Sequence, residues 1–173
     1  AADRNLAVKI IDNMTAPRPR FAGLAMTAPA IMGILNVTPD SFSDGGQHSA
    51  PALAVTAGKA MVAAGAGIID IGGESTRPGA APITRNQELA RVLPPLTGLR
   101  QCGAVLSIDT RHAAVMDRAS AAGAGIINDV AGLRGEGALE AASRPGCHVV
   151  IMPMPGTPEA LPAHPHYGFA PVH

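Results

Sequence analysis

The alternation of short apolar runs with alanine-rich stretches constrains the fold of this chain more than any other feature. Five runs have the length of a buried strand and lack the regular polar alternation of a strand that faces water. They occupy residues 30–35, 68–71, 105–108, 126–127 and 149–152. Stretches of helical length lie between them, at residues 51–64, 84–99, 112–122 and 138–143. This order predicts parallel βαβ units, in either a barrel or a doubly wound sheet.

Two local patterns support these units. Thr84 is followed three residues later by Gln87, which predicts a capping box at the start of the second helix. Residues 63–70 recur at 121–128, an offset of 58 residues, with seven of eight positions identical. Helix-to-strand turns favour Ala and Gly in general, which accounts for much of this match. The repeat nevertheless places Asp70 and Asn128 at equivalent strand ends.

Polar residues gather at the same end of successive predicted strands. Asn36 follows the first strand, Asp70 ends the second, Asp109 ends the third, and the pair 128–129 ends the fourth. In a (β/α)₈ barrel the active site lies at the carboxyl ends of the strands. The loops after the first two strands, 37–46 and 72–79, are long and polar, which predicts a functional role for them.

Composition excludes several classes of protein. Apolar residues make up 47% of the chain and charged residues 15%, so the chain is not disordered. Thirteen basic residues balance thirteen acidic ones, and no run approaches the roughly 18 apolar residues of a membrane span. We therefore expect no nucleic-acid and no membrane partner. Cys102 and Cys147 lack the spacing of a zinc site or a disulfide framework, which favours the cytoplasm.

Three residues have candidate chemical roles, each with a structural alternative. The guanidinium of Arg77 can bind phosphate or carboxylate, or form a surface ion pair. Asn36 can offer a neutral oxygen to Mg²⁺, or cap a turn. Asp109 follows an apolar strand and needs donors, such as the amino and ring N–H groups of a heterocycle, or it caps the helix near Arg111. These patterns alone predict an anion-binding α/β enzyme.

Longer stretches of sequence carry a family resemblance. Residues 31–46, IMGILNVTPDSFSDGG, resemble the first signature of the dihydropteroate synthases. Residues 70–79, DIGGESTRPG, resemble the second signature. The segments SIDT at 107–110 and INDV at 127–130 match the ends of the family's third and fourth strands. The resemblance extends from about residue 30 to residue 167.

That resemblance implies a TIM (β/α)₈ barrel. Residues 30–173 would hold about the first five βα units of an incomplete pterin-binding barrel, after an N-terminal lead-in at 1–29. The implied reaction joins 6-hydroxymethyl-7,8-dihydropterin diphosphate to p-aminobenzoate, giving 7,8-dihydropteroate and pyrophosphate. The implied partners are these small molecules, the implied cofactor is Mg²⁺, and a homodimer is compatible with the resemblance.

The resemblance also assigns roles to individual residues. Four would bind substrate, namely Asn36, Thr76, Asp109 and Asn128. Asn36 would contact the Mg²⁺–diphosphate and is the expected metal ligand. Asp109 and Asn128 would hydrogen-bond the pterin ring, and Thr76 would lie at the pterin diphosphate. Arg77 and Asp40 are the expected catalytic residues, and the loop that holds Asp40 would close over the substrates.

The sequence departs from the family pattern in two places. Pro153 lies between two methionines where the family commonly has His, so an imidazole and a backbone donor are missing there. The family's later strands carry an Asp, a Lys and an Arg-x-His, whereas the only lysines here are Lys9 and Lys59, neither in a suitable position. Since such barrels average about 250 residues, we expect a piece of a longer protein that is not a working synthase by itself.

Two other functions share parts of this pattern. A pterin-dependent methyltransferase on the same barrel would use the pterin pocket without the diphosphate and aminobenzoate loops. A truncated relic would retain the loops without catalysis. The two long signatures at 31–46 and 70–79 favour the synthase over the methyltransferase.

Overall fold

A computed structural model describes residues 20–38, 50–75, 81–144 and 146–152 of the chain. It begins with an antiparallel pair of short strands, β1 (Arg20–Phe21) and β2 (Leu24–Ala25). A parallel sheet follows, made of β3 (Met32–Asn36), β4 (Ile68–Gly72), β5 (Val105–Asp109), β6 (Ile126–Asp129) and β7 (His148–Ile151). The helices between these strands are α2 (Ala50–Ala63), α3 (Arg85–Leu99), α4 (Ala113–Ala122) and α5 (Ala138–Ala142).

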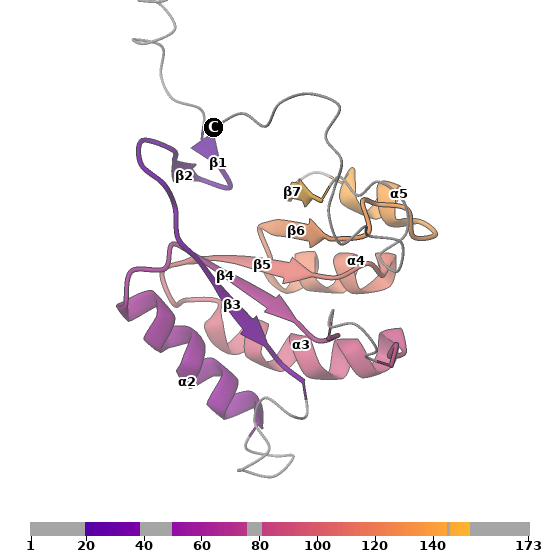
Figure 1. Cartoon of the computed structure of the whole chain (residues 1–173), viewed down its shortest axis with the longest axis horizontal. Helices are drawn as coiled ribbons and strands as arrows, with labels where there is room; N and C mark the ends of the chain where they lie inside the picture. The colour runs from indigo at the N-terminus through magenta and orange to yellow at the C-terminus, as the bar shows by residue number, and fades with distance from the viewer. Residues whose placement is uncertain (1–19, 39–49, 76–80, 145, 153–173) are drawn as a thin grey trace, which may run out of the picture.

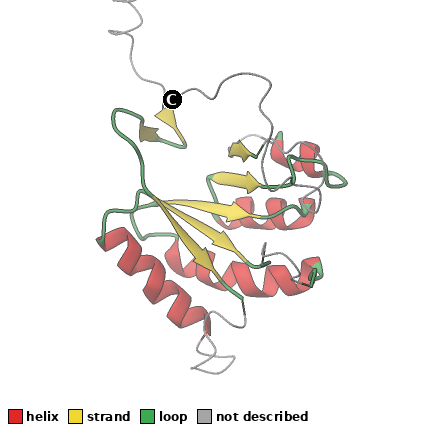
Figure 2. Cartoon of the chain, in the orientation of Figure 1, coloured by secondary structure: helices red, strands yellow, loops and turns green. Residues whose placement is uncertain are grey.

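The strands lie side by side in the order in which the chain visits them. The sheet order is β3-β4-β5-β6-β7, and every neighbouring pair is parallel. Figure 1 shows this succession, and Figure 2 shows the helices gathered on one side of the strands. A doubly wound sheet reverses its strand order near the middle, whereas a barrel does not. The expected barrel-type succession is therefore confirmed for the described residues, which contain five parallel strands and the four helices between them.

The predicted elements agree with the observed ones within a few residues. The capping box of α3 is present: Thr84 Oγ1 accepts from the Gln87 N–H at 3.3 Å, and Gln87 Oε1 accepts from the Thr84 N–H at 2.9 Å. The apolar run at 126–127 is only the first half of β6, and the pair 128–129 ends this strand, as predicted. The strand continues to Asp129, because residues 128 and 129 still pair with β7.

The two faces of the sheet have different chemistry. On the helix-covered face the strands supply apolar residues to the core: Leu35, Ile69, Ile71, Leu106, Ile108 and Ile127. Because side chains alternate along a strand, the intervening residues face the other way. That second face carries Asp70, Ser107, Asp109 and Asn128, together with Ile34, which is 54% exposed. We call it the inner face, since it would line the interior of a barrel.

The hairpin of β1 and β2 contacts the start of β7. The ring of Phe21 lies 5.0 Å from the ring of His148, at an interplanar angle of 71°. His148 is the first residue of β7, so this contact is at the amino end of the strand, opposite the polar edge. Sequence patterns did not predict this hairpin within the N-terminal lead-in. Within the described ranges, no helix is both long and apolar enough to span a membrane.

Candidate functional site

The carboxyl ends of four strands bring three of the predicted site residues into one row. In the sheet register Asn36 pairs with Gly72, Gly72 with Asp109, and Asp109 with Asn128. Neighbouring strands in such a sheet lie about 4.8 Å apart, so these positions are adjacent. All four belong to the inner face. The structure therefore places one amide, one carboxyl and a second amide side by side at the polar edge.

Gly72 leaves a gap within this row. A Cβ atom placed on Gly72 would lie 3.6 Å from Asn36 Oδ1 and 3.6 Å from Asp109 Oδ2. Both oxygens therefore approach the same space, which any larger side chain at position 72 would occupy. The glycine keeps that space open between two oxygen ligands. An arrangement of this kind can accommodate a polar ligand or a hard cation.

Asp109 is a half-buried carboxyl with an unusual protonation equilibrium. Burial, and after it the negative charges of Asp70, Glu88, Asp129 and Glu74, together raise its pKa to about 7. A ligand that donates N–H groups would favour the charged form and reverse this effect. The pKa of Asp109 should therefore fall when a ligand with N–H donors binds to its carboxylate.

The alternative role of Asp109 as a helix cap is wrong. Helix α4 begins at Ala113, and its N-cap residue is His112, whose side chain makes no capping hydrogen bond. Thr110 Oγ1 accepts from the His112 N–H at 3.1 Å, while Asp109 is still the last residue of β5. The carboxyl of Asp109 therefore belongs to the inner face and not to the helix.

Asn128 is held by a residue that sequence analysis had not assigned to the site. Its Nδ2 donates to Asp70 Oδ2 at 2.9 Å. Asp70 is only 2% exposed, and its Oδ1 has no hydrogen-bond partner among the described residues. The two residues end the two copies of the eight-residue repeat, which are offset by 58 residues. This repeat and the gathering of polar residues at strand ends were the sequence signals that could have pointed to the pair.

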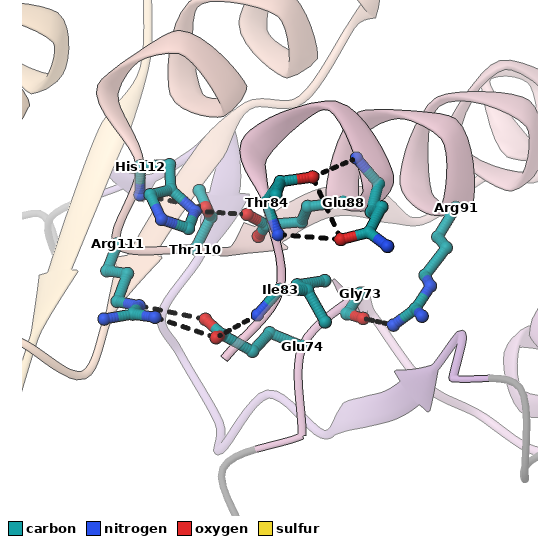
Figure 3. A network of polar contacts seen from close by, with 10 residues as sticks. Gly73, Glu74, Ile83, Thr84, Glu88, Arg91, Thr110, Arg111 and His112 are labelled. Carbon is teal, nitrogen blue, oxygen red and sulfur yellow. Dashed lines mark hydrogen bonds and ion pairs between the residues drawn. The ribbon is translucent and has the colours of Figure 1, made fainter. Parts of the chain in front are cut away.

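A network of polar contacts lies beside the row and joins two loops (Figure 3). Arg111 donates to Glu74 through both Nε, at 2.9 Å, and Nη2, at 2.8 Å. The Ile83 N–H also donates to Glu74, at 3.3 Å. Burial alone would raise the pKa of Glu74, but these hydrogen bonds and the charges of Arg111 and His112 lower it below its ordinary value. The connection after β4 is thereby tied to the connection after β5.

A second pair fixes the other side of the same connections. His112 Nδ1 lies 2.6 Å from Oε2 of Glu88, a fully buried residue of α3. Arg91, also on α3, donates to the Gly73 carbonyl at 2.9 Å. Both contacts are visible in Figure 3. No spacing pattern predicts them, because they join residues of elements that only tertiary packing brings together.

Three predicted site residues lie outside the described residues. They are Asp40, in the loop after β3, and Thr76 and Arg77, in the loop after β4. Pro153, the departure from the family pattern, also lies outside. Across the described ranges, no three His, Cys, Asp or Glu side chains gather as a metal cage would require.

A groove lies beside the row and not over it. It has a volume of about 700 Å³ and contains none of Asn36, Asp109 and Asn128. Its charged and polar lining comes from Thr84, Arg85, Arg111, His112, Arg134 and Glu136. The row itself is a better candidate, because its polar groups converge at the carboxyl ends of parallel strands, where ligands of such folds bind.

Consecutive parallel βα units with converging polar side chains at their carboxyl edge define a ligand-binding domain of the α/β barrel class. The family of pterin-binding enzymes, described as "Pterin binding enzyme", matches residues 32–170. The chain belongs to this family.

Its relatives are dihydropteroate synthases. The enzyme of Escherichia coli K12 is 48% identical over 145 residues, which cover 83% of this chain and 51% of that one. The solved structure of the Xanthomonas albilineans enzyme with 4-aminobenzoic acid has a TM-score of 0.77 and 49% identity, covering 89% of this chain and 55% of that one. The Yersinia pestis enzyme with a sulfonamide drug has a TM-score of 0.74 and 48% identity, covering 84% and 54%. The chain spans about half the length of these relatives.

Proposed function

We propose that the protein carrying this chain is a dihydropteroate synthase. It would condense 6-hydroxymethyl-7,8-dihydropterin diphosphate with p-aminobenzoate to give 7,8-dihydropteroate and pyrophosphate. The observation that carries the proposal is the row of Asn36, Asp109 and Asn128 at the carboxyl edge of a sheet in the pterin-binding family. The relatives are synthases, which favours this reaction over methyl transfer.

Asp109 and Asn128 would hold the pterin ring. They are neighbours in register on β5 and β6, so their side chains can meet adjacent atoms of one heterocycle edge. The carboxylate of Asp109 accepts hydrogen bonds from amino and ring N–H groups. Its pKa of about 7 reflects burial and, after it, the nearby acidic residues. Burial disfavours the ionised form of Asp109. Hydrogen bonds from the bound ring would therefore stabilise that carboxylate.

Asn36 would hold Mg²⁺ together with the diphosphate. Its exposed side chain and the nearby Asp109 carboxyl bring two oxygen atoms to the gap beside Gly72, and oxygen is the ligand that Mg²⁺ prefers. Two protein ligands are enough for this role, because Mg²⁺ usually keeps several waters and is bound through one or two carboxylates plus substrate phosphates. When bound, the cation would neutralise charge on the leaving pyrophosphate.

The loops that follow β3 and β4 would supply the remaining groups. In the proposed reaction the amine nitrogen of p-aminobenzoate attacks the exocyclic methylene carbon of the pterin. The carbon–oxygen bond to the diphosphate breaks, pyrophosphate leaves with the electron pair, and the amine loses a proton. We propose Arg77 and Asp40 as the catalytic residues and Thr76 as a ligand of the diphosphate. The network around Glu74 and Arg111 would anchor the β4 loop that carries Thr76 and Arg77.

We place the reaction in the cytoplasm. Cys102 and Cys147 are both free thiols, and free thiols persist in reducing compartments. Cys147 lies 3.1 Å from Ser120 Oγ and 3.3 Å from the Ala124 carbonyl, which is a packing environment and not a disulfide one. A homodimer stays a prediction from the family resemblance.

The test is an assay of the protein at its natural length. Purified protein is incubated with Mg²⁺, the pterin diphosphate and p-aminobenzoate, and both 7,8-dihydropteroate and pyrophosphate are measured. We expect equal amounts of the two products, and none when either substrate is omitted. Product formed from methyltetrahydrofolate instead, or no product from a folded protein that binds no pterin, would contradict the proposal.

A further inference from the structure

We infer that Asp70 is a positioning residue that fixes the amide of Asn128, so that the site presents an acceptor oxygen to its ligand. The inference rests on the proposed function, because it names how the proposed pterin site chooses its substrate. Asp70 itself does not touch the ligand in this scheme. It acts through the 2.9 Å hydrogen bond from Asn128 Nδ2 to its own Oδ2.

The contact spans an intervening strand. Asp70 lies on β4 and Asn128 on β6, with β5 between them. In register, Asp70 aligns with Ser107 and Ile126, two residues before Asn128. The two backbones are therefore farther apart than the about 9.6 Å of two strand spacings, and the side chains must meet across β5. The residue of β5 in register with Asp70 is Ser107, which is fully buried and has a short side chain. A larger residue at Ser107 would block the contact, so the fold leaves room for it.

The chemistry of Asp70 sets the direction of the amide. Asp70 accepts through Oδ2, so the group of Asn128 that faces it is the NH₂. The two ends of a planar amide point in different directions, and the Oδ1 of Asn128 is consequently turned away from Asp70. An Asn with no fixed partner could present either end to a ligand. In this structure the NH₂ group of Asn128 already donates to Asp70, so the oxygen is the end that faces the ligand.

The result is a pair of neighbouring acceptors. Asn128 Oδ1 and the Asp109 carboxylate lie on adjacent strands, in register, at the same edge of the inner face. They match a heterocycle edge with two adjacent donors, such as the amino group and ring N–H of a 2-amino-4-oxopyrimidine. A 2,4-dioxo ring replaces one of these donors with an acceptor and would face a carbonyl or carboxylate oxygen. The site should therefore discriminate between the two rings through the Asp70–Asn128 contact.

The experiment measures that preference in the protein at its natural length. The probes are 6-hydroxymethylpterin and its 2,4-dioxo counterpart, and the readout is the ratio of their dissociation constants. We expect the unsubstituted protein to prefer the 2-amino ring, and Asp70→Asn to reduce the ratio about tenfold, since leaving one buried group mismatched has about that effect. Ser107→Ala is the matched control, a buried inner-face change that removes no contact to Asn128, and it should keep the ratio.

A swapped pair keeps the test decisive if Asp70→Asn fails to fold. In the double variant Asp70→Asn with Asn128→Asp, the amide and the carboxylate exchange places, and position 128 again presents an acceptor. We expect this variant to recover the preference for the 2-amino ring. An unchanged ratio in a folded Asp70→Asn variant, or no preference in the swapped pair, would overturn the positioning role. Binding of neither ring by the unsubstituted protein would overturn the proposed function as well.

Discussion

At the scale of single residues, the proposed site depends on the protonation of Asp109. Its pKa of about 7 means that this carboxyl carries a proton in much of the population near neutral pH. The causes are burial and, after it, the negative charges of Asp70, Glu88, Asp129 and Glu74. Without ligand, stability should fall as pH rises from the ordinary 3.8 toward 7, because the folded state then binds more protons than the unfolded one.

Pterin binding should show the opposite dependence on pH. A ring that donates N–H groups requires the carboxylate, so affinity should rise as pH increases toward about 7 and level off above it. Below that value each pH unit should weaken binding by up to about tenfold. Calorimetric titration of 6-hydroxymethylpterin between about pH 5.5 and 7.5 measures this slope. Asp109→Asn should bind about 1–3 kcal/mol more weakly, with a flat profile. If the affinity of Asp109→Asn depended on pH as steeply as that of the unsubstituted protein, a group other than Asp109 would be responsible, and the assignment would be wrong.

Asn36 should matter only for ligands that carry the diphosphate. Asn36→Ala removes a neutral oxygen that Mg²⁺ would use and leaves the ring-binding positions on β5 and β6 intact. We expect weaker Mg²⁺-dependent binding of the pterin diphosphate, by about 1–3 kcal/mol, and unchanged binding of 6-hydroxymethylpterin. The comparison is made by titration with and without Mg²⁺. Equal losses for both ligands would indicate a general structural defect and contradict the assignment.

At the scale of elements, two adjacent glycines at the end of β4 should have different sensitivities. A Cβ on Gly73 would lie 2.8 Å from Val92 Cγ1 and 3.1 Å from Glu88 Cγ, both on α3. Gly73→Ala should therefore destabilise the fold by about 1–3 kcal/mol, as overpacking does. Gly72→Ala is the control, because its Cβ has no described contact closer than 3.6 Å.

Urea denaturation with binding measurements separates the two effects. Gly72→Ala should leave the unfolding free energy within about 0.5 kcal/mol and weaken ligand binding, because it narrows the gap between Asn36 and Asp109. Gly73→Ala should lower the unfolding free energy through its contact with α3. Equal destabilisation by both changes would contradict the packing described at this strand end.

The ion pair between Glu74 and Arg111 should contribute more to stability than a comparable surface pair. Arg111 binds Glu74 through two nitrogens, and the Glu74 side chain is only 17% exposed. Arg144 pairs with Asp117 with side chains that are 64% and 31% exposed. Arg111→Ala should cost about 1–2 kcal/mol and Arg144→Ala less than about 1 kcal/mol, measured by urea denaturation. A larger loss in Arg144→Ala would contradict this order.

The same elements show how far the sequence predicts the fold. Strands buried on the helix side form apolar runs, so all five were located to within two residues at either end. The capping box at Thr84 was predicted because its signal is local. The apolar run of β6 is only two residues long, and its polar end was found because Asn128 and Asp129 match the polar ends of the neighbouring strands.

The contacts that hold the site were beyond sequence patterns. The positions of Asn36, Asp109 and Asn128 followed from strand ends, which a parallel sheet aligns at one edge. The bond between Asp70 and Asn128 requires the strand order and the small Ser107 beneath it, and neither is visible in spacing alone. The Glu88–His112 and Glu74–Arg111 pairs depend on how α3 and the loop after β5 pack.

At the scale of the whole molecule, one face of the sheet packs in the apolar core that stabilises the fold, and the opposite face carries the side chains of the proposed ligand site. The helix-covered face contains the apolar core, while the inner face carries the acidic and amide side chains. This division is typical of barrel enzymes, in which function changes at the carboxyl ends of strands without disturbing the core. It explains how polar residues such as Asp70 and Ser107 can be buried here while the core remains apolar.

The most direct test is a crystal structure of the protein at its natural length with 6-hydroxymethylpterin. The predicted result is a ring at the carboxyl edge of the sheet, with its donor edge within hydrogen-bond distance of Asp109 and of Asn128 Oδ1. Asn128 Nδ2 should still donate to Asp70, as it does at 2.9 Å without ligand. A ring bound instead in the neighbouring groove beside Arg85, Arg111 and Arg134, with the row left untouched, would contradict the assignment of the pterin site.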